Sequence, residues 1–454
     1  MRRRPQLFGT DGIRGVAGNY PLDRRTVASL GQALAEVLAS HPGAKQPQVL
    51  LGEDTRESSA WIARVLAAGL QGRGAAVISA GVLTTPGVAF LTRHYGFSAG
   101  VMVSASHNPF EDNGIKILST AGTKLAEAME LEIEHAMAET SCSSAEPPEA
   151  ELPTEPALKQ AYLDFLANLI PANSRISRFQ LVVDCAHGAA SGLIPEFLSL
   201  LGIPARILHA EPDGRNINLR AGSVHPEKMA ALTQSAEADL GVAFDGDADR
   251  SIFASRRGRI CDGDHVIFAV APFLKAQHRL KGDAVVGTLM TNLGLELALR
   301  DKGIGMKRTP VGDKFVLDEM LRSGINLGGE PSGHIIFSDV SLAGDGAVTL
   351  LQMLRLLVET GETMDELVRE YRPFPQLIRN VRVTQKAPLE SVPEVVDSLA
   401  QCRQELAGRG RVVVRYSGTE PVARVMVEGE AAERVEFHAN LIAAAIQHSL
   451  GAND

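Results

Sequence analysis

The sequence predicts an α/β protein with several domains, and three observations lead to this fold class. The chain has 454 residues. A single hydrophobic core usually stops growing well below this length, so three or four domains are expected. Hydrophobic residues make up 45% and charged residues 22% of the chain, as in globular proteins. Short apolar runs typical of strands alternate along the chain with segments of helical spacing.

Composition also excludes several classes of protein. No apolar run approaches the roughly 18 residues of a membrane helix, and the N-terminal stretch lacks the apolar core of a signal peptide. We therefore expect a soluble, cytoplasmic protein that does not bind a membrane. The formal net charge of -9 argues against a nucleic-acid partner. The four cysteines match neither a zinc nor a disulfide pattern and are interpreted as reduced thiols: Cys142, Cys185, Cys261 and Cys402.

The first unit opens with a glycine-dense loop around one cation, Arg14. Its glycines follow the spacing GxxGxxG, which is not the dinucleotide-binding fingerprint, and a plain glycine turn is the competing interpretation. Helical spacing follows over residues 27–38, and strands are expected at residues 49–51 and 75–78. Between these strands, residues 54–58 are typical of a loop that caps the next helix.

A polar loop in the first unit is the best candidate for chemistry. The buried strand expected at residues 101–103 leads into this loop, which contains Ser106 and His107. A turn signal at residues 112–114 then brings Lys116 back toward the same place. We hypothesise that Ser106 carries a phosphoryl group, which would add about -1.5 to -2 charges at neutral pH. A Ser/His/Asn turn without chemistry is the alternative, and the lack of a GxSxG elbow weakens a hydrolase interpretation.

The remainder of the chain predicts a linker and further units. Residues 141–156 are rich in Pro, Glu and Ser and indicate a linker, and Pro373 and Pro375 mark the start of the last unit. Further strands are expected at residues 181–183, 240–244, 285–286 and 412–414. A turn and a helix are expected over residues 188–201, and a further helix at residues 432–446. The expected domains are residues 1–156, 157–257, 258–372 and 373–454.

Three carboxylates alternate with other residues directly after the second unit's strand at residues 240–244. They are Asp245, Asp247 and Asp249. Three hard oxygen donors so close together suit a divalent cation. An EF-hand loop is excluded, because its sixth position would be Arg250 and its twelfth Arg256. A solvated acidic turn remains the alternative. Because Mg²⁺ often fills open coordination positions with water and a phosphate oxygen, this site points to a phosphoryl group.

Two further loops offer partners for a sugar phosphate. Residues 415–421, with Arg424 on the next element, provide cations, hydroxyls and a glycine that lets backbone N–H groups bind an anion. Glu330, Ser332 and His334 alternate along another loop and suit sugar hydroxyls. A plain Ser-Gly-Thr turn and a helix-capping loop are the respective alternatives. Since ligands of α/β proteins bind beyond the carboxyl ends of strands, we expect these loops to converge on one cleft.

Four motifs together resemble the α-D-phosphohexomutase superfamily and, within it, closely the bacterial phosphoglucosamine mutases. They occur in family order and at family spacing over essentially the whole chain: Ser-Ala-Ser-His-Asn-Pro, Asp-Gly-Asp-Ala-Asp-Arg, Gly-Glu-Pro-Ser-Gly-His and Arg-Tyr-Ser-Gly-Thr-Glu-Pro. The resemblance implies a heart-shaped molecule around a central cleft. Three similar mixed α/β domains would be followed by a smaller C-terminal α+β domain that binds phosphate and closes over the cleft.

The resemblance also implies a role for each matched residue. Ser106 would be the phosphoserine, with His107 beside it, and Arg14 and Lys116 would act as transition-state stabiliser and acid/base assistant. The implied Mg²⁺ ligands are Asp245, Asp247, Asp249 and Ser106. The implied contacts to sugar hydroxyls are Glu330, Ser332 and His334. The residues that would hold the phosphate not being transferred are Arg415, Ser417, Gly418, Thr419 and Arg424.

The implied activity is the interconversion of glucosamine 6-phosphate and glucosamine 1-phosphate through a phosphoserine enzyme and a 1,6-bisphosphate intermediate. It would feed the synthesis of UDP-N-acetylglucosamine and cell-wall precursors. One Mg²⁺ per chain is implied, with glucosamine 1,6-bisphosphate or glucose 1,6-bisphosphate as activator. The alternatives are the same chemistry on glucose or mannose phosphate, a serine-dependent phosphatase, and an inactive sugar-phosphate-binding protein. The resemblance leaves open whether the chain forms a homodimer.

Overall fold

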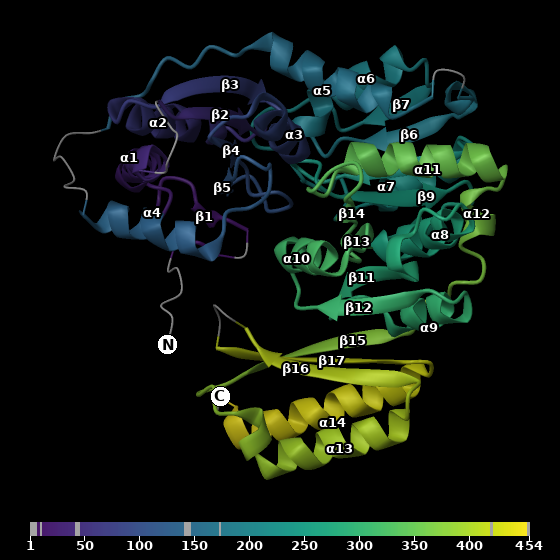
Figure 1. The fold of residues 1–454 in the computed structure, drawn as a ribbon. Helices are drawn as coiled ribbons and strands as arrows, with labels where there is room; N and C mark the ends of the chain where they lie inside the picture. Colours follow the sequence, from purple (N-terminus) through teal and green to yellow (C-terminus); the bar gives the residue numbers. More distant parts are fainter. Residues whose placement is uncertain are drawn as a thin grey trace.

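The structure is a computed structural model and describes residues 7–9, 11–40, 46–139, 147–171, 174–417 and 421–451. Within these ranges it contains three mixed β-sheets and a smaller antiparallel one. The first three sheets with their helices follow one another around an arc, and the fourth lies below the third (Figure 1). The predicted multi-domain α/β fold class with a smaller α+β unit is therefore confirmed. No helix of the described residues is long and apolar enough to cross a membrane.

The first sheet has the strand order β1-β5-β4-β2-β3. Strands β3, β2 and β4 are parallel, β5 is antiparallel to β4, and β1 is antiparallel to β5. The strands are β1 (Ile13–Val16), β2 (Gln48–Glu53), β3 (Ala76–Val82), β4 (Ala99–Val103) and β5 (Asp112–Leu118). The helices are α1 (Arg24–Ser40), α2 (Ser59–Gly72), α3 (Thr85–Tyr95) and α4 (Glu127–Glu139).

The second sheet, β10-β9-β8-β6-β7, repeats this arrangement of parallel and antiparallel neighbours. Its strands are β6 (Leu181–Asp184), β7 (Ala205–Leu208), β8 (Leu240–Phe244), β9 (Ser251–Ser255) and β10 (Ile260–Cys261). The neighbouring helices are α5 (Pro156–Asn168), α6 (Ile194–Leu200) and α7 (Glu227–Ser235). The edge strand β10 lies just beyond the boundary predicted after residue 257. The other predicted domain boundaries, after residues 156 and 372, remain predictions.

The third sheet, β12-β11-β13-β14, has the same arrangement without the outermost antiparallel strand. Its strands are β11 (Ala284–Thr288), β12 (Gly305–Thr309), β13 (Leu327–Gly329) and β14 (Ile335–Phe337). Its helices are α8 (Gly263–Ala276), α9 (Leu293–Asp301), α10 (Asp313–Ser323), α11 (Gly346–Thr360) and α12 (Met364–Leu367). The fourth sheet, β15-β17-β16, contains β15 (Gln376–Arg382), β16 (Gly410–Tyr416) and β17 (Val422–Gly429), with helices α13 (Pro393–Leu406) and α14 (Ala432–Leu450).

The shared topology puts three loops in equivalent places. In each mixed sheet, a central parallel strand is followed by an antiparallel neighbour, and the loop between the two lies at the carboxyl end of the parallel strand. These loops follow β4, β8 and β13, and they contain Ser106, the three aspartates from Asp245 to Asp249, and Glu330 to His334 respectively. Sheet edges of this kind are where α/β proteins bind ligands.

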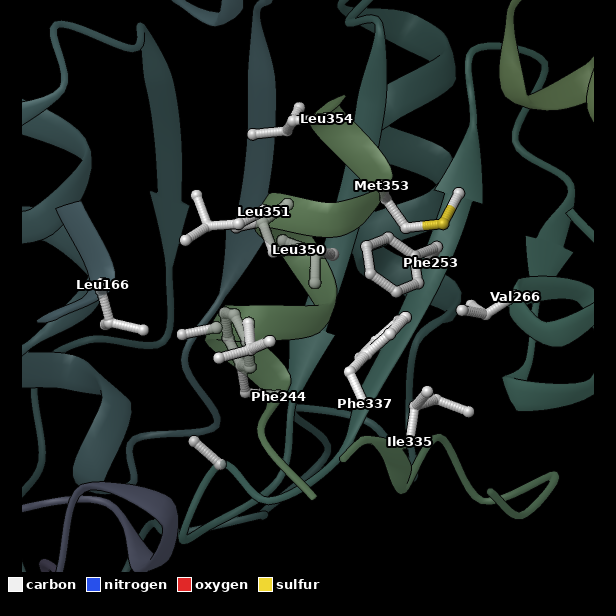
Figure 2. Packing of buried hydrophobic residues seen from close by; sticks show 14 of the residues in the cluster. Leu166, Phe244, Phe253, Val266, Ile335, Phe337, Leu350, Leu351, Met353 and Leu354 are labelled. Carbon is white, nitrogen blue, oxygen red and sulfur yellow. The ribbon is translucent and has the colours of Figure 1, made fainter. Parts of the chain in front are cut away.

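Helix α11 packs between the second and third sheets (Figure 2). Its residues Leu350 and Met353 are completely buried, next to Phe253 of β9 and Phe337 of β14 in the figure. All four belong to one hydrophobic cluster that spans both sheets. A continuous core of this kind fixes the second and third sheets relative to each other, and with them the loops at their ends.

Most predicted elements are present, including the helices predicted at residues 27–38 and 432–446, which lie within α1 and α14. The turn and helix predicted over residues 188–201 are also present, as a 3₁₀ turn, Ala189–Gly192, followed by α6. Three cysteines are free and buried, as predicted: Cys185, Cys261 and Cys402. Cys142 lies outside the described residues.

Two local predictions in the first unit are wrong. Residues 112–114 are the first residues of β5 rather than a turn, because Asn113 is buried and its side-chain amide donates to the hydroxyls of Ser58 and Ser59 at 2.8 and 3.0 Å. The predicted helix cap at residues 54–58 is absent, since Ser58 makes no side-chain capping hydrogen bond to α2. Long-range polar contacts replace the local ones in both places.

The linker predicted at residues 141–156 falls partly outside the described residues. Its described part, residues 147–156, lies against the first unit. Glu149 forms ion pairs with Arg24 and Arg64 at 2.7 and 2.6 Å, and Thr154 forms a β-bridge with Ser79. The first helix of the second unit, α5, begins at the end of this stretch.

Replacing Leu350 by Ala should lower the free energy of unfolding by about 2 to 5 kcal/mol, because the substitution removes buried apolar contacts and leaves a cavity between two sheets. Urea denaturation followed by circular dichroism would measure the change. The control is Glu362→Ala at an exposed position just beyond α11, which should change stability by less than about 0.5 kcal/mol. An equally small effect of Leu350→Ala would show that α11 does not form the core between the sheets.

Candidate active site

The three equivalent loops line one cavity of about 510 Å³. His107 comes from the first loop, Asp249 and Arg250 from the second, and Glu330 and His334 from the third. The N-terminal loop adds a further wall with Asp11, Gly12 and Arg14. The predicted convergence of polar loops is therefore observed for the first three units.

Ser106 is buried, and its hydroxyl contacts the aspartate cluster. The hydroxyl donates a hydrogen bond of 2.6 Å to Oδ2 of Asp245, and Nδ1 of His107 lies 3.3 Å from the same hydroxyl oxygen. The φ angle of Ser106 is 54°, in the left-handed region that residues with a side chain occupy at a cost in free energy. The structure thus joins the predicted phosphoserine to the first predicted metal ligand.

The aspartate cluster has the properties of a metal site. The ligand oxygens of Asp245, Asp247 and Asp249 lie within 4.8 Å of one another, and all three residues are buried. Oδ1 of Asp247 and Oδ1 of Asp249 have no hydrogen-bond partner among the described residues. Buried polar atoms are nearly always paired, so two such oxygens beside a third carboxylate fit a hard divalent cation. Three protein ligands leave coordination positions for other oxygens.

Backbone amides at the N-termini of two helices hold the aspartate loop in place. The amide and the hydroxyl of Thr85, the first residue of α3, donate to the carbonyl oxygen and the carboxylate of Asp247, the amide at 3.0 Å. The amide of Gly346, the first residue of α11, donates to the carbonyl oxygen of Ala248 at 3.1 Å. Both helix N-termini carry partial positive charge, which suits a loop of carboxylates.

The carboxyl groups of the cluster differ in acidity. Burial and the neighbouring charges of Asp249 and Asp247 raise the pKa of Asp245 well above its usual value. Burial acts in the same direction on Asp249, but Lys116 and His334 hold the pKa of Asp249 well below its usual value. Asp249 therefore stays ionised, and Asp245 depends on added positive charge to do so.

Lys116 is buried against the same cluster. Its Nζ donates to Oδ2 of Asp247 at 2.6 Å and lies 3.5 Å from Oδ2 of Asp249 and 3.4 Å from Oδ2 of Asp11. Burial alone would lower its pKa, but these three carboxylates raise it above the usual value. Lys116 is therefore an ammonium ion that can stabilise an anion or donate a proton, and it is not a base in this state.

Arg14 and a pair of lysines extend this charged network across the cavity. The guanidinium of Arg14 forms an ion pair with Asp11 and donates to the carbonyl oxygen of Ala105 at 3.2 Å. Lys124 of the first unit lies 2.5 Å from both Asp11 and Asp313, the first residue of α10 in the third unit. Burial would raise the pKa of Asp11, but Lys116, Lys124 and Arg14 together hold it far below the usual value.

His107 is neutral at physiological pH and accepts from Arg250. Nη1 of Arg250 lies 3.2 Å from Nδ1 of His107. Burial, together with the positive charges of Arg250 and Arg14, lowers the pKa of His107 to about 4. Its Nδ1 can therefore accept from Arg250 next to the Ser106 hydroxyl, which supports an orienting role near that oxygen.

The loop from Glu330 to His334 contains a histidine that is charged, in contrast to the neutral His107. Its amide at Glu330 donates to the carbonyl oxygen of His334 at 3.0 Å, and Oε1 of Glu330 accepts from the amide of Gly312 at 3.1 Å. Burial alone would lower the pKa of His334, but Asp249, Asp313 and Glu330 raise it to about 9. His334 is therefore charged. The hydroxyl of Ser332 is buried without a hydrogen-bond partner among the described residues, and Ser332, unlike Glu330 and His334, is not part of the cavity lining.

The described residues among the predicted phosphate ligands of the last unit, Arg415, Ser417 and Arg424, do not line this cavity. Arg415 on β16 and Arg424 on β17 lie directly opposite each other in the fourth sheet, and Ser417 is buried at the end of β16. The lining residues of the cavity come from the first three units. Gly418 and Thr419 lie outside the described residues.

Sequence reasoning missed several residues that build the site. The pairing of Asp11 with Arg14 could have been predicted, because Asp11 precedes Arg14 by three residues in the glycine-dense loop. Thr85 and Asp247 are separated by 162 positions, and Lys124 and Asp313 by 189, so no local pattern could have paired them.

Fold and site together define a class of protein: the chain belongs to the phosphoglucomutase/phosphomannomutase family. Models of the family's α/β/α domains I, II and III match residues 5–143, 160–258 and 262–374, and the model of its C-terminal domain matches residues 379–445. The four matches follow one another in family order along nearly the whole chain. The resemblance to the phosphohexomutases is therefore confirmed.

Within this family, the chain is similar to proteins named phosphoglucosamine mutase. Those of Koribacter versatilis and Solibacter usitatus are each 47% identical to it, and the alignments cover 98% of this chain and 97% and 99% of theirs. That of Anaeromyxobacter sp. is 42% identical, with coverage of 98% and 96%. The resemblance to the phosphoglucosamine mutase branch is thereby confirmed.

Solved structures agree on the fold. A putative phosphomannomutase from Thermus thermophilus has a TM-score of 0.79 at 24% identity, covering 98% of this chain and 99% of that chain. A phosphoglucomutase/phosphomannomutase family protein from Burkholderia thailandensis has a TM-score of 0.78 at 21% identity, with the same coverage. An Aspergillus fumigatus N-acetylphosphoglucosamine mutase, solved in complex with GlcNAc-6P and magnesium, has a TM-score of 0.64 at 20% identity, covering 90% and 85% of the two chains.

The aspartate cluster predicts a specific loss of metal binding. Asp247→Asn should weaken Mg²⁺ binding by about 10- to 100-fold or more, because the variant loses one of the three charged ligands. Isothermal titration calorimetry would measure the affinity. Asp397→Asn, at an exposed position on α13, is the control and should bind Mg²⁺ as the unchanged protein does. Equal affinity in all three proteins would exclude the aspartate cluster as the metal site.

Proposed function

We propose that this protein interconverts glucosamine 6-phosphate and glucosamine 1-phosphate by a phosphoserine mechanism, in keeping with the name of its 47% identical relatives. One observation carries the proposal: the Ser106 hydroxyl lies 2.6 Å from Asp245, in a cluster where the Lys116 ammonium is 2.6 Å from Asp247. An oxygen that can carry phosphate, a set of cation-binding carboxylates and a fixed positive charge in one buried place suit phosphoryl transfer.

The reaction has two halves that mirror each other. In the first, the Oγ–P bond of phosphorylated Ser106 breaks, a P–O bond to the free hydroxyl of the sugar monophosphate forms, and the hydroxyl proton ends on Ser106. The sugar is then a 1,6-bisphosphate. After it has turned around, its other phosphoryl group moves to Ser106 and the serine proton ends on the sugar oxygen. The sum is an isomerisation in which neither water nor phosphate is consumed.

The side chains around Ser106 take distinct roles in this scheme. Lys116 stays protonated, so it stabilises the charge of the transferring phosphoryl group and can donate a proton to a leaving oxygen. Arg14 supplies a second positive charge beside the carbonyl oxygen of Ala105. His107 is neutral and holds Arg250 close to the Ser106 hydroxyl. These assignments are supported by the distances and charges of the site.

We assign one Mg²⁺ per chain to Asp245, Asp247 and Asp249, together with an oxygen on Ser106. When bound, the ion would supply positive charge that offsets the charge of the transferring phosphoryl group. Two carboxylate oxygens that accept no hydrogen bond from the described residues support this assignment, as does the magnesium in the A. fumigatus enzyme. Glucosamine 1,6-bisphosphate or glucose 1,6-bisphosphate would act as activator, because either can phosphorylate a free Ser106.

Glu330, Ser332 and His334 would contact the sugar hydroxyls, and the last domain would hold the phosphate that is not transferred. We assign that phosphate to Arg415, Ser417, Gly418, Thr419 and Arg424. The two arginines lie opposite each other on neighbouring strands, which concentrates positive charge at one end of the fourth sheet. Because Arg415, Ser417 and Arg424 are not among the residues that line the cavity of the first three units, the assignment requires the last domain to close over it. Closure would also keep water from the phosphoserine.

The sugar preference and the nucleophile can be tested in one assay. The purified protein is treated with glucose 1,6-bisphosphate and Mg²⁺, and kcat/KM is measured for glucosamine, glucose and mannose 6-phosphates. We expect the highest value for glucosamine 6-phosphate.

Ser106→Ala should lose at least about 10³-fold in kcat, together with the mass increase of the phosphorylated protein, because no other group replaces the phosphoryl carrier. Ser119→Ala, in the same domain, is the control and should keep both.

Each alternative has its own outcome in this assay. Faster turnover of glucose or mannose 6-phosphate would overturn the assignment to glucosamine. Release of inorganic phosphate without isomerisation would indicate a phosphatase, and binding without turnover a sugar-phosphate-binding protein. Full activity of Ser106→Ala would contradict the phosphoserine mechanism.

A further inference from the structure

Two side chains from outside the Ser106 loop hold the same two backbone carbonyl groups within it. Nη2 of Arg56 donates to the carbonyl oxygens of Ser106 and Asn108 at 3.0 and 2.9 Å. Nδ2 of Asn218 donates to the same two oxygens at 2.9 and 3.1 Å. Arg56 belongs to the loop after β2 and Asn218 to the second unit, so this carbonyl clamp, formed by Arg56 and Asn218, joins two units of the molecule.

Arg56 is itself fixed by a buried ion pair. Its Nε lies 2.9 Å from Oδ2 of Asp54, and both side chains are completely buried. Asp54 also accepts from the hydroxyl of Ser104 at 2.7 Å, and that hydroxyl accepts from the amide of Ser106 at 2.9 Å. The N–H and the C=O of Ser106 are therefore tied to one buried polar network. Such networks impose one geometry because an unpaired buried charge is costly.

The conformation that this network imposes is an uncommon one. Ser106 has a φ of 54°, in the left-handed region that a serine seldom occupies. Its carbonyl oxygen also packs against Gly246 in the aspartate loop, where a Cβ would collide with it. Residues held in such regions persist only where the surrounding structure determines them, and they occur often at active sites.

The position of the serine oxygen follows from these backbone contacts. Once the N–H and the C=O of Ser106 are fixed, the direction of its Cα–Cβ bond is fixed as well. Only rotation about that bond remains, and the hydrogen bond to Asp245 sets it. If the backbone relaxed to a commoner conformation, the serine oxygen would move away from the aspartate cluster.

We propose that Arg56 and Asn218 are positioning residues for phosphoryl transfer, which aim the oxygen of Ser106 at the aspartate cluster by holding its backbone in the left-handed conformation. The proposal rests on the proposed function of Ser106 as the phosphoryl carrier. A misplacement of about 1 Å in a reacting group can cost about 100-fold in rate. The clamp therefore acts on kcat, and not on the binding of the sugar, whose contacts lie on other loops.

The test compares Arg56→Lys, Asn218→Ala and the double variant with the unchanged protein. Each single variant should lose about tenfold in kcat, with KM for glucosamine 6-phosphate within about twofold of the unchanged value. The double variant should lose more than the product of the two single losses, because each side chain alone still holds both carbonyl groups. Matched controls are Arg64→Lys on α2 and Asn216→Ala near Asn218, both half-buried, and these should keep kcat.

A second measurement separates positioning from a general loss of stability. Hydrogen exchange of the amides of residues 104–110, followed by mass spectrometry without substrate, should speed up in the double variant and not in the controls. Thermal unfolding shows whether each variant is folded. The proposal would be overturned by a loss of kcat in the double variant equal to the product of the two single losses. A change confined to KM, or unchanged hydrogen exchange of residues 104–110, would also overturn it.

Failure of the proposed function would look different. If the unchanged protein turned over no hexosamine phosphate, or Ser106→Ala stayed active, the role of Ser106 as carrier would fall. The exchange of residues 104–110 would still report whether Arg56 and Asn218 hold the loop.

Discussion

Three carboxylates buried within 4.8 Å of one another impose the constraint on which the rest of this structure depends. Like charges at such distances repel strongly where water is excluded, so they persist only beside cations. Those cations come from all three mixed units: Lys116 from the first, Arg250 from the second and His334 from the third. Balancing the charge of the aspartates therefore assembles the three units around one point.

The repeated topology explains how three sheets can serve one site. Each mixed sheet presents one loop between a central parallel strand and its antiparallel neighbour. In the first sheet this loop supplies an oxygen that can carry phosphate, in the second carboxylates that suit a cation, and in the third groups suited to a sugar. The loop after the neighbouring strand β2 has a different role in the first sheet. Its residue Arg56 holds the backbone of the Ser106 loop. The same sheet position therefore repeats while its chemistry changes.

The local parts of the site could be predicted from the sequence, and the long-range parts could not. Ser106 and the three aspartates each follow a short apolar run, and the predicted strand and polar loop are present at both places, because they are encoded within a few residues. The clamp of Asn218 on Ser106 spans 112 positions, and nothing near either residue marks it. The turn predicted at residues 112–114 failed for the same reason, because distant serines occupy the Asn113 side chain. Likewise, the sequence could suggest Arg415 as a phosphate ligand but not where the last domain lies.

The central claim, that Ser106 stores a phosphoryl group between two halves of one turnover, is tested most directly by following that group. Protein labelled with radioactive phosphate on Ser106 is mixed with one equivalent of unlabelled glucosamine 6-phosphate and quenched over time. The account predicts that the label leaves the protein at least as fast as one turnover and appears first in the sugar bisphosphate and then in the monophosphates. Label that stayed on the protein while the sugar isomerised, or that left it as inorganic phosphate at that rate, would contradict the account.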